Sequence, residues 1–152
     1  MIDLRYDTDE QGEKRMQTRV EDTIKRHNKG YNCAQAVACT YCDLVRVDEE
    51  TMFKMTEALG LGMGAMQGTC GAMTGACVLA GMKASTGNLE QPNSKMNSYQ
   101  LAREITNRFQ EQNGSLVCKE LKGVETGKML RSCSDCIKDA AGLVEMILFA
   151  EE

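Results

Sequence analysis

The chain has 152 residues, enough for one domain that buries a hydrophobic core without disulfide bonds. Its net charge of −4 is spread evenly, and the lack of a basic patch argues against a nucleic-acid partner. There is no Trp, and three Phe and four Tyr are outnumbered by eleven Met, a composition that favours helices over sheets.

We expect no targeting segment in the N-terminal region. We expect residues 1–9 to form a loose tail, followed by a single helical, cysteine-rich domain over residues 10–152. The start of the chain lacks the basic and apolar pattern of a signal peptide, so we expect a cytoplasmic protein.

The first helix is predicted over residues 10–29. Met16, Val20 and Ile24 are spaced four residues apart and form a narrow apolar stripe on an otherwise polar helix, which should end at Gly30. The only histidine, His27, lies among basic residues near the end of this helix, where we expect it to be exposed to solvent.

The second helix is predicted to begin after Asn32, which can cap it, with Gln35 at the capping-box position. It should extend to about Val45. Cys39 and Cys42 lie three residues apart on one face of it, with Cβ atoms about 5–6 Å apart, whereas a disulfide needs about 3.5–4.5 Å. We therefore expect both cysteines to fill the core.

Residues 59–82 form a run without a single charge, which should lie in the middle of the fold. The glycines over residues 60–64 predict a loop or loosely wound turn, and Thr69 can cap a central helix over about 70–85. A transmembrane helix is the alternative for such a run. Seven glycines and three polar residues leave too few consecutive apolar residues for it, and we expect no membrane span.

Capping residues and apolar spacing predict the remaining helices. They are expected over residues 49–59, 94–112, 116–121 and 137–149, the last after a cap at 132–136. The side chains expected to face mostly inward on the longest are Met96, Tyr99, Leu101, Ile105 and Phe109. No segment alternates with period two, so the predicted fold is all-α, a compact bundle of about seven helices around the buried, glycine-rich central helix.

Eight cysteines without an export signal indicate metal binding, redox chemistry or burial rather than a disulfide framework. Cys33, Cys70 and Cys133 each follow a capping residue, which predicts the first position of a helix, and Cys118 lies one residue further into its own. The helix dipole and unpaired N–H groups at such positions stabilise a thiolate and lower the thiol pKa. We expect Cys77, two turns beyond Cys70, to be a packing residue.

Two kinds of chemistry need thiols in such positions. A redox dithiol needs one thiolate that attacks and a second sulfur that resolves the mixed disulfide, whereas a metal ion or cluster needs several thiolates together. Both require the cysteines to converge. The pair Cys133 and Cys136 has the C-x-x-C spacing found in disulfide oxidoreductases and in metal sites, and the single histidine excludes multi-histidine sites.

Four segments carry a wider pattern. They are Gly-Tyr-Asn-Cys-Ala-Gln-Ala at 30–36, Thr-Cys-Gly-Ala-Met-Thr-Gly-Ala at 69–76, Gly-Ser with Cys-Lys-Glu-Leu at 114–121, and Cys133 with Asp-Ala-Ala at 139–141. In this order, over about residues 28–148, they resemble the C_GCAxxG_C_C family of redox-active proteins, named after its cysteine pattern.

The resemblance implies a small helical protein that acts in redox chemistry through four characteristic cysteines, Cys33, Cys70, Cys118 and Cys133. Some relatives are associated with transport loci or with haem-containing redox proteins, but this chain has no C-x-x-C-H haem signature. Where the family often has Pro and a basic residue after its last cysteine, this chain has Ser134 and Asp135, and Cys136 stands where an aromatic residue is common. The fourth site residue is therefore either Cys133 or Cys136.

The leading hypothesis is a thiol-based redox protein, a thiol–disulfide oxidoreductase with an unspecified redox partner or transport-linked protein. Cys70 is given the attacking role because the neighbouring glycines leave its sulfur approachable. Cys33 is then the first choice as resolving partner, with Cys118 and Cys133 as a second pair or as support.

Two alternatives stay open. In one, the same four cysteines bind zinc, copper(I) or an iron–sulfur cluster in a binding or electron-transfer module, and Met63, Met66 and Met73 would suit a soft metal, although buried methionines are more typical of a core. In the other, the small-residue face of Gly71 and Gly75 packs against another protein or a second copy in a homo-oligomer.

Overall fold

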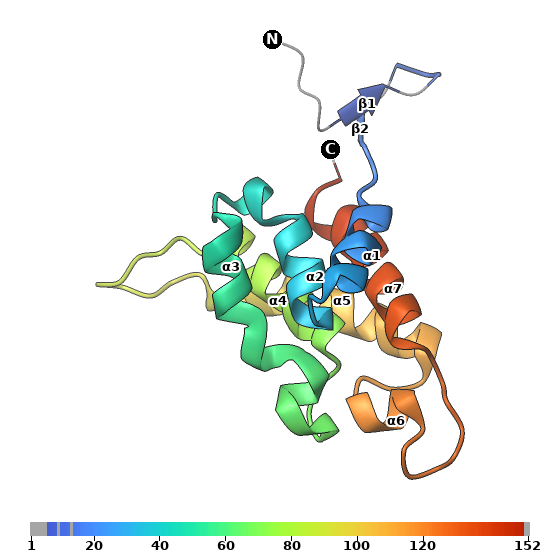
Figure 1. Cartoon of the computed structure of the whole chain (residues 1–152). Helices are drawn as coiled ribbons and strands as arrows, with labels where there is room; N and C mark the ends of the chain where they lie inside the picture. Colours follow the sequence, from blue (N-terminus) through green and yellow to red (C-terminus); the bar gives the residue numbers. More distant parts are fainter. Residues whose placement is uncertain (1–5, 9, 13, 151–152) are drawn as a thin grey trace.

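The computed structural model describes residues 6–8, 10–12 and 14–150, and in this part of the chain seven α-helices make up nearly all of the regular structure (Figure 1). They are α1 (Val20–Lys29), α2 (Cys33–Thr40), α3 (Glu49–Thr56), α4 (Gly71–Ala84), α5 (Lys95–Asn113), α6 (Cys118–Lys122) and α7 (Cys133–Leu148). Three short helical turns connect them, η1 (Cys42–Val45), η2 (Glu57–Leu59) and η3 (Gly62–Met66). The all-α prediction is confirmed.

A small β-hairpin, rather than a helix, precedes α1. Strand β1 (Tyr6–Thr8) pairs antiparallel with β2 (Lys14–Met16), with Tyr6 opposite Met16. Gly12, between the strands, takes a φ of 82°, a left-handed conformation that a continuous helix cannot contain. This turn is the physical reason why the helix does not start at residue 10.

The helix predicted over residues 10–29 is therefore confirmed only in its second half. It begins at Val20 and ends, as predicted, at Gly30, whose φ of 121° stops it. Of the tail expected over residues 1–9, residues 1–5 and 9 lie outside the described residues, and residues 6–8 belong to β1.

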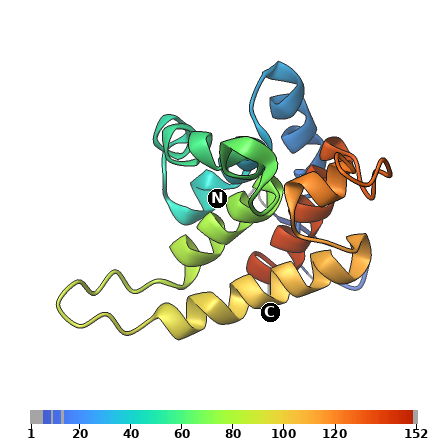
Figure 2. The same ribbon diagram turned by 90° about the horizontal axis from the view of Figure 1, so that it is seen from below.

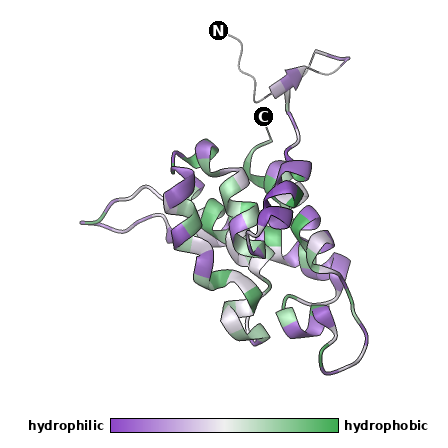
Figure 3. Cartoon of the chain, viewed as in Figure 1, coloured by the Kyte–Doolittle hydropathy of each residue, from purple (hydrophilic) through white to green (hydrophobic). Residues whose placement is uncertain are grey.

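Helix α4 lies at the centre of the bundle and packs against α2, α5 and α7 (Figure 1 and Figure 2). The fully buried side chains around it come from nearly every helix and include Val37, Met52, Met73, Leu79, Ile105, Phe109, Ile137 and Leu148. Figure 3 shows hydrophobic residues on the central helices and mostly hydrophilic residues on the hairpin and α1. The prediction of a buried central helix over about 70–85 is confirmed.

The glycines of α4 set how closely α2 approaches it. A Cβ atom on Gly75 would lie 2.6 Å from the carbonyl oxygen of Ala34, and one on Gly71 would lie 3.2 Å from the Cβ of Cys33. A side chain at Gly75 would therefore collide with the backbone of α2. The small-residue face is covered by α2 of the same chain, so it is not free to pack against another protein, and the contact brings the N-termini of α2 and α4 together.

Helix caps explain where the cysteine-bearing helices begin. The Asn32 side chain accepts a hydrogen bond from the backbone N–H of Gln35, and the Gln35 side chain accepts one from the Asn32 N–H, which completes the predicted capping box. Ser132 caps α7 by accepting from the N–H of Asp135. The cap of α4 is one residue later than predicted, at Cys70 instead of Thr69.

Two predictions of inward-facing side chains on α5 are wrong. Ile105 and Phe109 are fully buried, but Met96 and Tyr99 are 62% and 50% exposed. Both lie in the first turns of α5, where the helix extends beyond the other helices beside the projecting 85–94 connection (Figure 2). None of the helices in the described part of the chain combines the length and apolarity that a membrane span needs.

Candidate functional site

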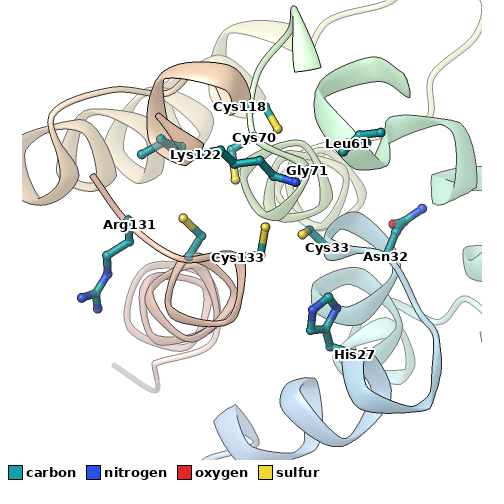
Figure 4. Close-up of a pocket in the computed structure, with 12 residues that line it drawn as sticks. His27, Asn32, Cys33, Leu61, Cys70, Gly71, Cys118, Lys122, Arg131 and Cys133 are labelled. Carbon is teal, nitrogen blue, oxygen red and sulfur yellow. The ribbon is translucent and has the colours of Figure 1, made fainter. Parts of the chain in front are cut away.

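The N-termini of α2, α4, α6 and α7 meet around one cavity of about 190 Å³ (Figure 4). Cys33, Cys118 and Cys133 are the first residues of α2, α6 and α7, and Cys70 immediately precedes α4. The residues that line the cavity are His27, Asn32, Cys33, Leu61, Cys70, Gly71, Cys118, Leu121, Lys122, Arg131, Cys133 and Cys136. All four cysteines expected at the site line this cavity, and Cys136 joins them.

Cys33 and Cys133 form the first pair of thiols, which we call the outer pair because both are only half-buried. Their side chains point toward each other from α2 and α7 (Figure 4). A hydrogen bond from the Cys33 thiol, together with the charge and a hydrogen bond of Lys122, lowers the pKa of Cys133 to about 5. The same hydrogen bond and burial raise the pKa of Cys33, so the outer pair holds a thiolate beside a thiol at neutral pH.

Cys70 and Cys136 form the second pair, the inner pair, and both are buried. Hydrogen bonding from the Cys136 thiol lowers the pKa of Cys70, helped by the backbone N–H groups of Ala72 and Met73 in the first turn of α4. The hydrogen bond to Cys70 and burial raise the pKa of Cys136. The inner pair thus repeats the hydrogen-bonded arrangement of the outer pair, with one pKa lowered and the other raised, deeper in the protein.

A short backbone ladder holds Cys118 beside Cys70. Thr69 and Val117 form an isolated antiparallel bridge, in which the N–H of Cys70 donates to Leu116 O at 2.7 Å and the N–H of Cys118 donates to Gly68 O at 3.0 Å. Burial raises the pKa of Cys118, so this thiol stays protonated at neutral pH. Cys118 accordingly lines the site without belonging to either thiol pair.

The turn η3 shapes the cavity wall next to Cys118. Gly62 has a φ of 56°, and a Cβ atom there would lie 2.5 Å from the Cβ of Cys118. Leu61 and Met63 also adopt left-handed conformations, which are strained for residues with side chains. The turn expected from the glycines at 60–64 is present, and its strained backbone lets Cys118 pack directly against it.

Lys122 supplies the positive charge of the site. Its ammonium group extends across the cavity between the cysteines (Figure 4), and it acts on Cys33, Cys118 and Cys133. Lys122 forms no ion pair with any of the described carboxylates, and no Asp or Glu lines the cavity. Its charge is therefore available to the thiolates.

Two further basic side chains at the cavity, Arg131 and His27, are held by neighbours. Arg131 donates two hydrogen bonds to Asp139, at 2.9 and 3.0 Å, and its guanidinium group points away from the cavity in Figure 4. His27 lies beside the cavity with its Nδ1 3.0 Å from Tyr31 O, so Nδ1 carries the proton of the neutral ring and Nε2 can accept one. His27 is thus a half-buried cavity residue, and the prediction of an exposed helix end is wrong.

The described cysteines are arranged as pairs rather than as a ligand shell. No group of three or more Cys, His, Asp or Glu side chains among the described residues has the geometry to hold a metal ion. Of the methionines that would suit a soft metal, Met63 is 51% exposed and Met73 is fully buried in the core.

Sequence reasoning missed Lys122 and His27 and treated Cys136 only as an alternative to Cys133. A signal existed for Lys122, which follows Cys118 by four residues and so shares its helical face. No comparable signal existed for His27, because its place depends on how α1 packs beside α2. Cys39 and Cys42 lie away from the cavity and are buried, as predicted.

The fold and the cavity define a small helical, cysteine-rich protein whose thiols gather at the N-termini of four helices. A family model described as putative redox-active protein (C_GCAxxG_C_C) matches residues 31–147. The chain belongs to this family, as the cysteine pattern predicted. No curated protein and no solved structure matches it.

Proposed function

We propose that the protein carries out thiol–disulfide exchange, with Cys133 as the attacking residue and Cys33 as the resolving residue. The observation that carries the proposal is the outer pair, in which two cysteines from the N-termini of different helices point at each other beside Lys122. The assignment differs from the sequence-based one, which gave the attack to Cys70. Cys70 is 6% exposed, whereas Cys133 is half-buried and open to a substrate.

In the first step, the Cys133 thiolate attacks one sulfur of a substrate disulfide. A bond forms between Cys133 and that sulfur, the substrate disulfide breaks, and the other substrate sulfur leaves as a thiolate, which takes a proton from solvent. The hydrogen bond from the Cys33 thiol and the charge of Lys122 stabilise the attacking thiolate. The product is a mixed disulfide between Cys133 and the substrate.

In the second step, the Cys33 sulfur attacks Cys133. The Cys33–Cys133 disulfide forms, the bond to the substrate breaks, and the second substrate sulfur leaves and takes up the proton that Cys33 loses. His27 lines the same cavity and can take that proton on Nε2, because its Nδ1 donates to Tyr31 O. Two electrons have passed from the outer pair to the substrate, and the steps run in reverse when the protein is the oxidant.

The proposal is tested with the aromatic disulfide dithiobis(nitrobenzoate), added to the anaerobically reduced protein in a stopped-flow instrument. Wild type should release one thionitrobenzoate quickly and a second one as the outer disulfide closes. Cys133→Ser should lose the fast first release, whereas Cys33→Ser should keep it and delay the second about tenfold or more. Equal fast release from Cys133→Ser would overturn the assignment.

A metal analysis on the same anaerobic preparation tests the metal-binding alternative. We expect no stoichiometric metal and thiols that convert reversibly to a disulfide, mapped by proteolysis and mass spectrometry to Cys33 and Cys133. The opposite result is that denaturation releases a metal or chromophore and exposes four protected thiols at the same time. That result would overturn the dithiol function and favour a binding module.

A further inference from the structure

The outer and inner pairs differ in what can reach them. Cys33 and Cys133 are half-buried, whereas Cys70 and Cys136 are 6% and 2% exposed. A bulky substrate can therefore meet the outer pair but not the inner pair. Yet all four sulfurs line the same cavity, so a sulfur of one pair can meet a sulfur of the other.

We propose that Cys136, with Cys70, is a second redox dithiol that exchanges with the outer pair and takes over its disulfide. This rests on the proposed function, because the outer disulfide must form before it can be passed inward. Cys136 is then a redox residue of this chain in addition to the four cysteines of the family pattern.

Helix α7 provides the connection between the pairs. Cys133 and Cys136 stand three residues apart in its first turn, with Cβ atoms about 5–6 Å apart, too far for a disulfide with each other. Each instead faces a partner on another helix, Cys133 toward Cys33 on α2 and Cys136 toward Cys70 at the start of α4. One turn of helix thus carries one member of each pair.

The exchange balances as two substitutions at sulfur. The Cys70 thiolate attacks the Cys133 sulfur of the outer disulfide, which forms a Cys70–Cys133 disulfide and releases the Cys33 thiolate. Cys136 then attacks the Cys70 sulfur, the Cys70–Cys136 disulfide forms, and Cys133 leaves as a thiolate, while the Cys136 proton passes to Cys33. The inner pair loses two electrons, and the outer pair gains them.

The consequence is a capacity of four electrons for each chain. After the transfer, the outer pair is reduced again and can react with a second disulfide molecule. The buried inner disulfide is protected from bulky reductants, so it should return its electrons through the outer pair. Two disulfides, each worth two electrons, would therefore be held in one cavity at two depths.

The test follows the disulfides in the wild-type protein after one equivalent of dithiobis(nitrobenzoate). Samples are quenched in acid at increasing times, alkylated and mapped. We expect the Cys33–Cys133 linkage to appear first and to be replaced by Cys70–Cys136. A linkage that stays at Cys33–Cys133, or a final Cys70–Cys118 linkage, would overturn the inference and leave the proposed function intact, whereas no internal linkage at all would overturn both.

A count after excess oxidant gives a second readout. Wild type should reach two internal disulfides per chain, and Cys136→Ser should reach one. Cys77→Ser is the matched control, because Cys77 lies on α4 away from the cavity, and it should still reach two. Two disulfides in Cys136→Ser would contradict the role of Cys136, and the wild-type time course decides the question if this variant does not fold.

Discussion

The chain contains two C-x-x-C pairs with identical spacing and opposite surroundings. Cys133 and Cys136 occupy the first turn of α7, at the cavity, next to Lys122. Cys39 lies in the last turn of α2 and Cys42 begins η1, and both are enclosed in the core. The Cys42 thiol donates to Cys39 O at 3.2 Å, an ordinary use for a buried thiol.

The two pairs differ chemically because of burial, helix polarity and nearby charge. Burial, followed by the charges of Cys42 and Glu49, raises the pKa of Cys39 to about 12, while the cavity lowers the pKa of Cys133 to about 5. The arginines near Cys39 are already engaged, Arg26 with Glu49 and Arg19 with Asp43. Spacing alone therefore does not lower a thiol pKa; a hydrogen bond from a neighbouring thiol and a free cation do.

The largest effect is expected on the alkylation rate when Cys133 is replaced. At pH 5.5 an ordinary thiol is almost fully protonated, whereas Cys133 is still mostly thiolate. Cys133→Ser should slow alkylation by iodoacetamide at this pH about a hundredfold, since the cysteines that remain are buried or protonated. Cys42→Ser is the control, and an equal loss in that variant would remove the contrast.

Gly75 sets how closely α2 packs on α4. This close packing places Cys33, at the start of α2, at the cavity. Gly75→Ala should lower the free energy of unfolding by about 2 kcal/mol, because its Cβ would meet the Ala34 carbonyl oxygen at 2.6 Å. Gly81→Ala, on the same helix with open space around it, should be neutral or slightly stabilising. Urea denaturation of the two reduced variants measures the difference, and equal stabilities would refute this account of the helix contact.

A smaller effect on the alkylation rate is expected when the charge of Lys122 is removed. Lys122→Met removes a positive charge that favours the thiolate, so the pKa of Cys133 should rise and the pH profile of its alkylation should move to higher pH. At pH 5.5 the rate should fall about fivefold. Lys128→Met changes the same charge in the exposed 123–131 loop and should leave the profile in place; a matching shift would show that only the net charge counts.

The smallest effect is expected at the buried pair. Cys42→Ser keeps the size of the side chain and its hydrogen bond to Cys39 O, so the free energy of unfolding should change by less than about 1 kcal/mol. The dithiobis(nitrobenzoate) kinetics should match those of wild type. A lost fast phase would mean that the core pair takes part in the exchange after all.

Local signals in the sequence were sufficient to place the cysteines on their helices. Asn32 and Ser132 are strong caps, so the positions of Cys33 and Cys133 follow from rules about single helix ends. The central helix followed from a capping residue at its start and from the charge-free run that contains it. At Cys70 the prediction was off by one residue, since the backbone pairing of Thr69 with Val117 competes with capping.

Rules about single helix ends could not predict the contacts between helices. Which thiol faces which depends on the packing of α7 against α2 and α4, and no spacing within one segment encodes it. The hairpin before α1 was missed because its strands have only three residues each, too short to show alternation. His27 was misplaced for the same reason as the pairs, since its surroundings come from another helix.

The outer pair, Cys33 on α2 and Cys133 on α7, has a further consequence for the unfolded chain. A bond from Cys33 to Cys133 would close a loop across most of the sequence, and loops of about 100 residues restrict the unfolded ensemble by about 4–5 kcal/mol in the chain-entropy model. The oxidised protein should therefore resist heat and proteases far better than the reduced one. Its lifetime in the presence of a protease would therefore report the redox state of the protein.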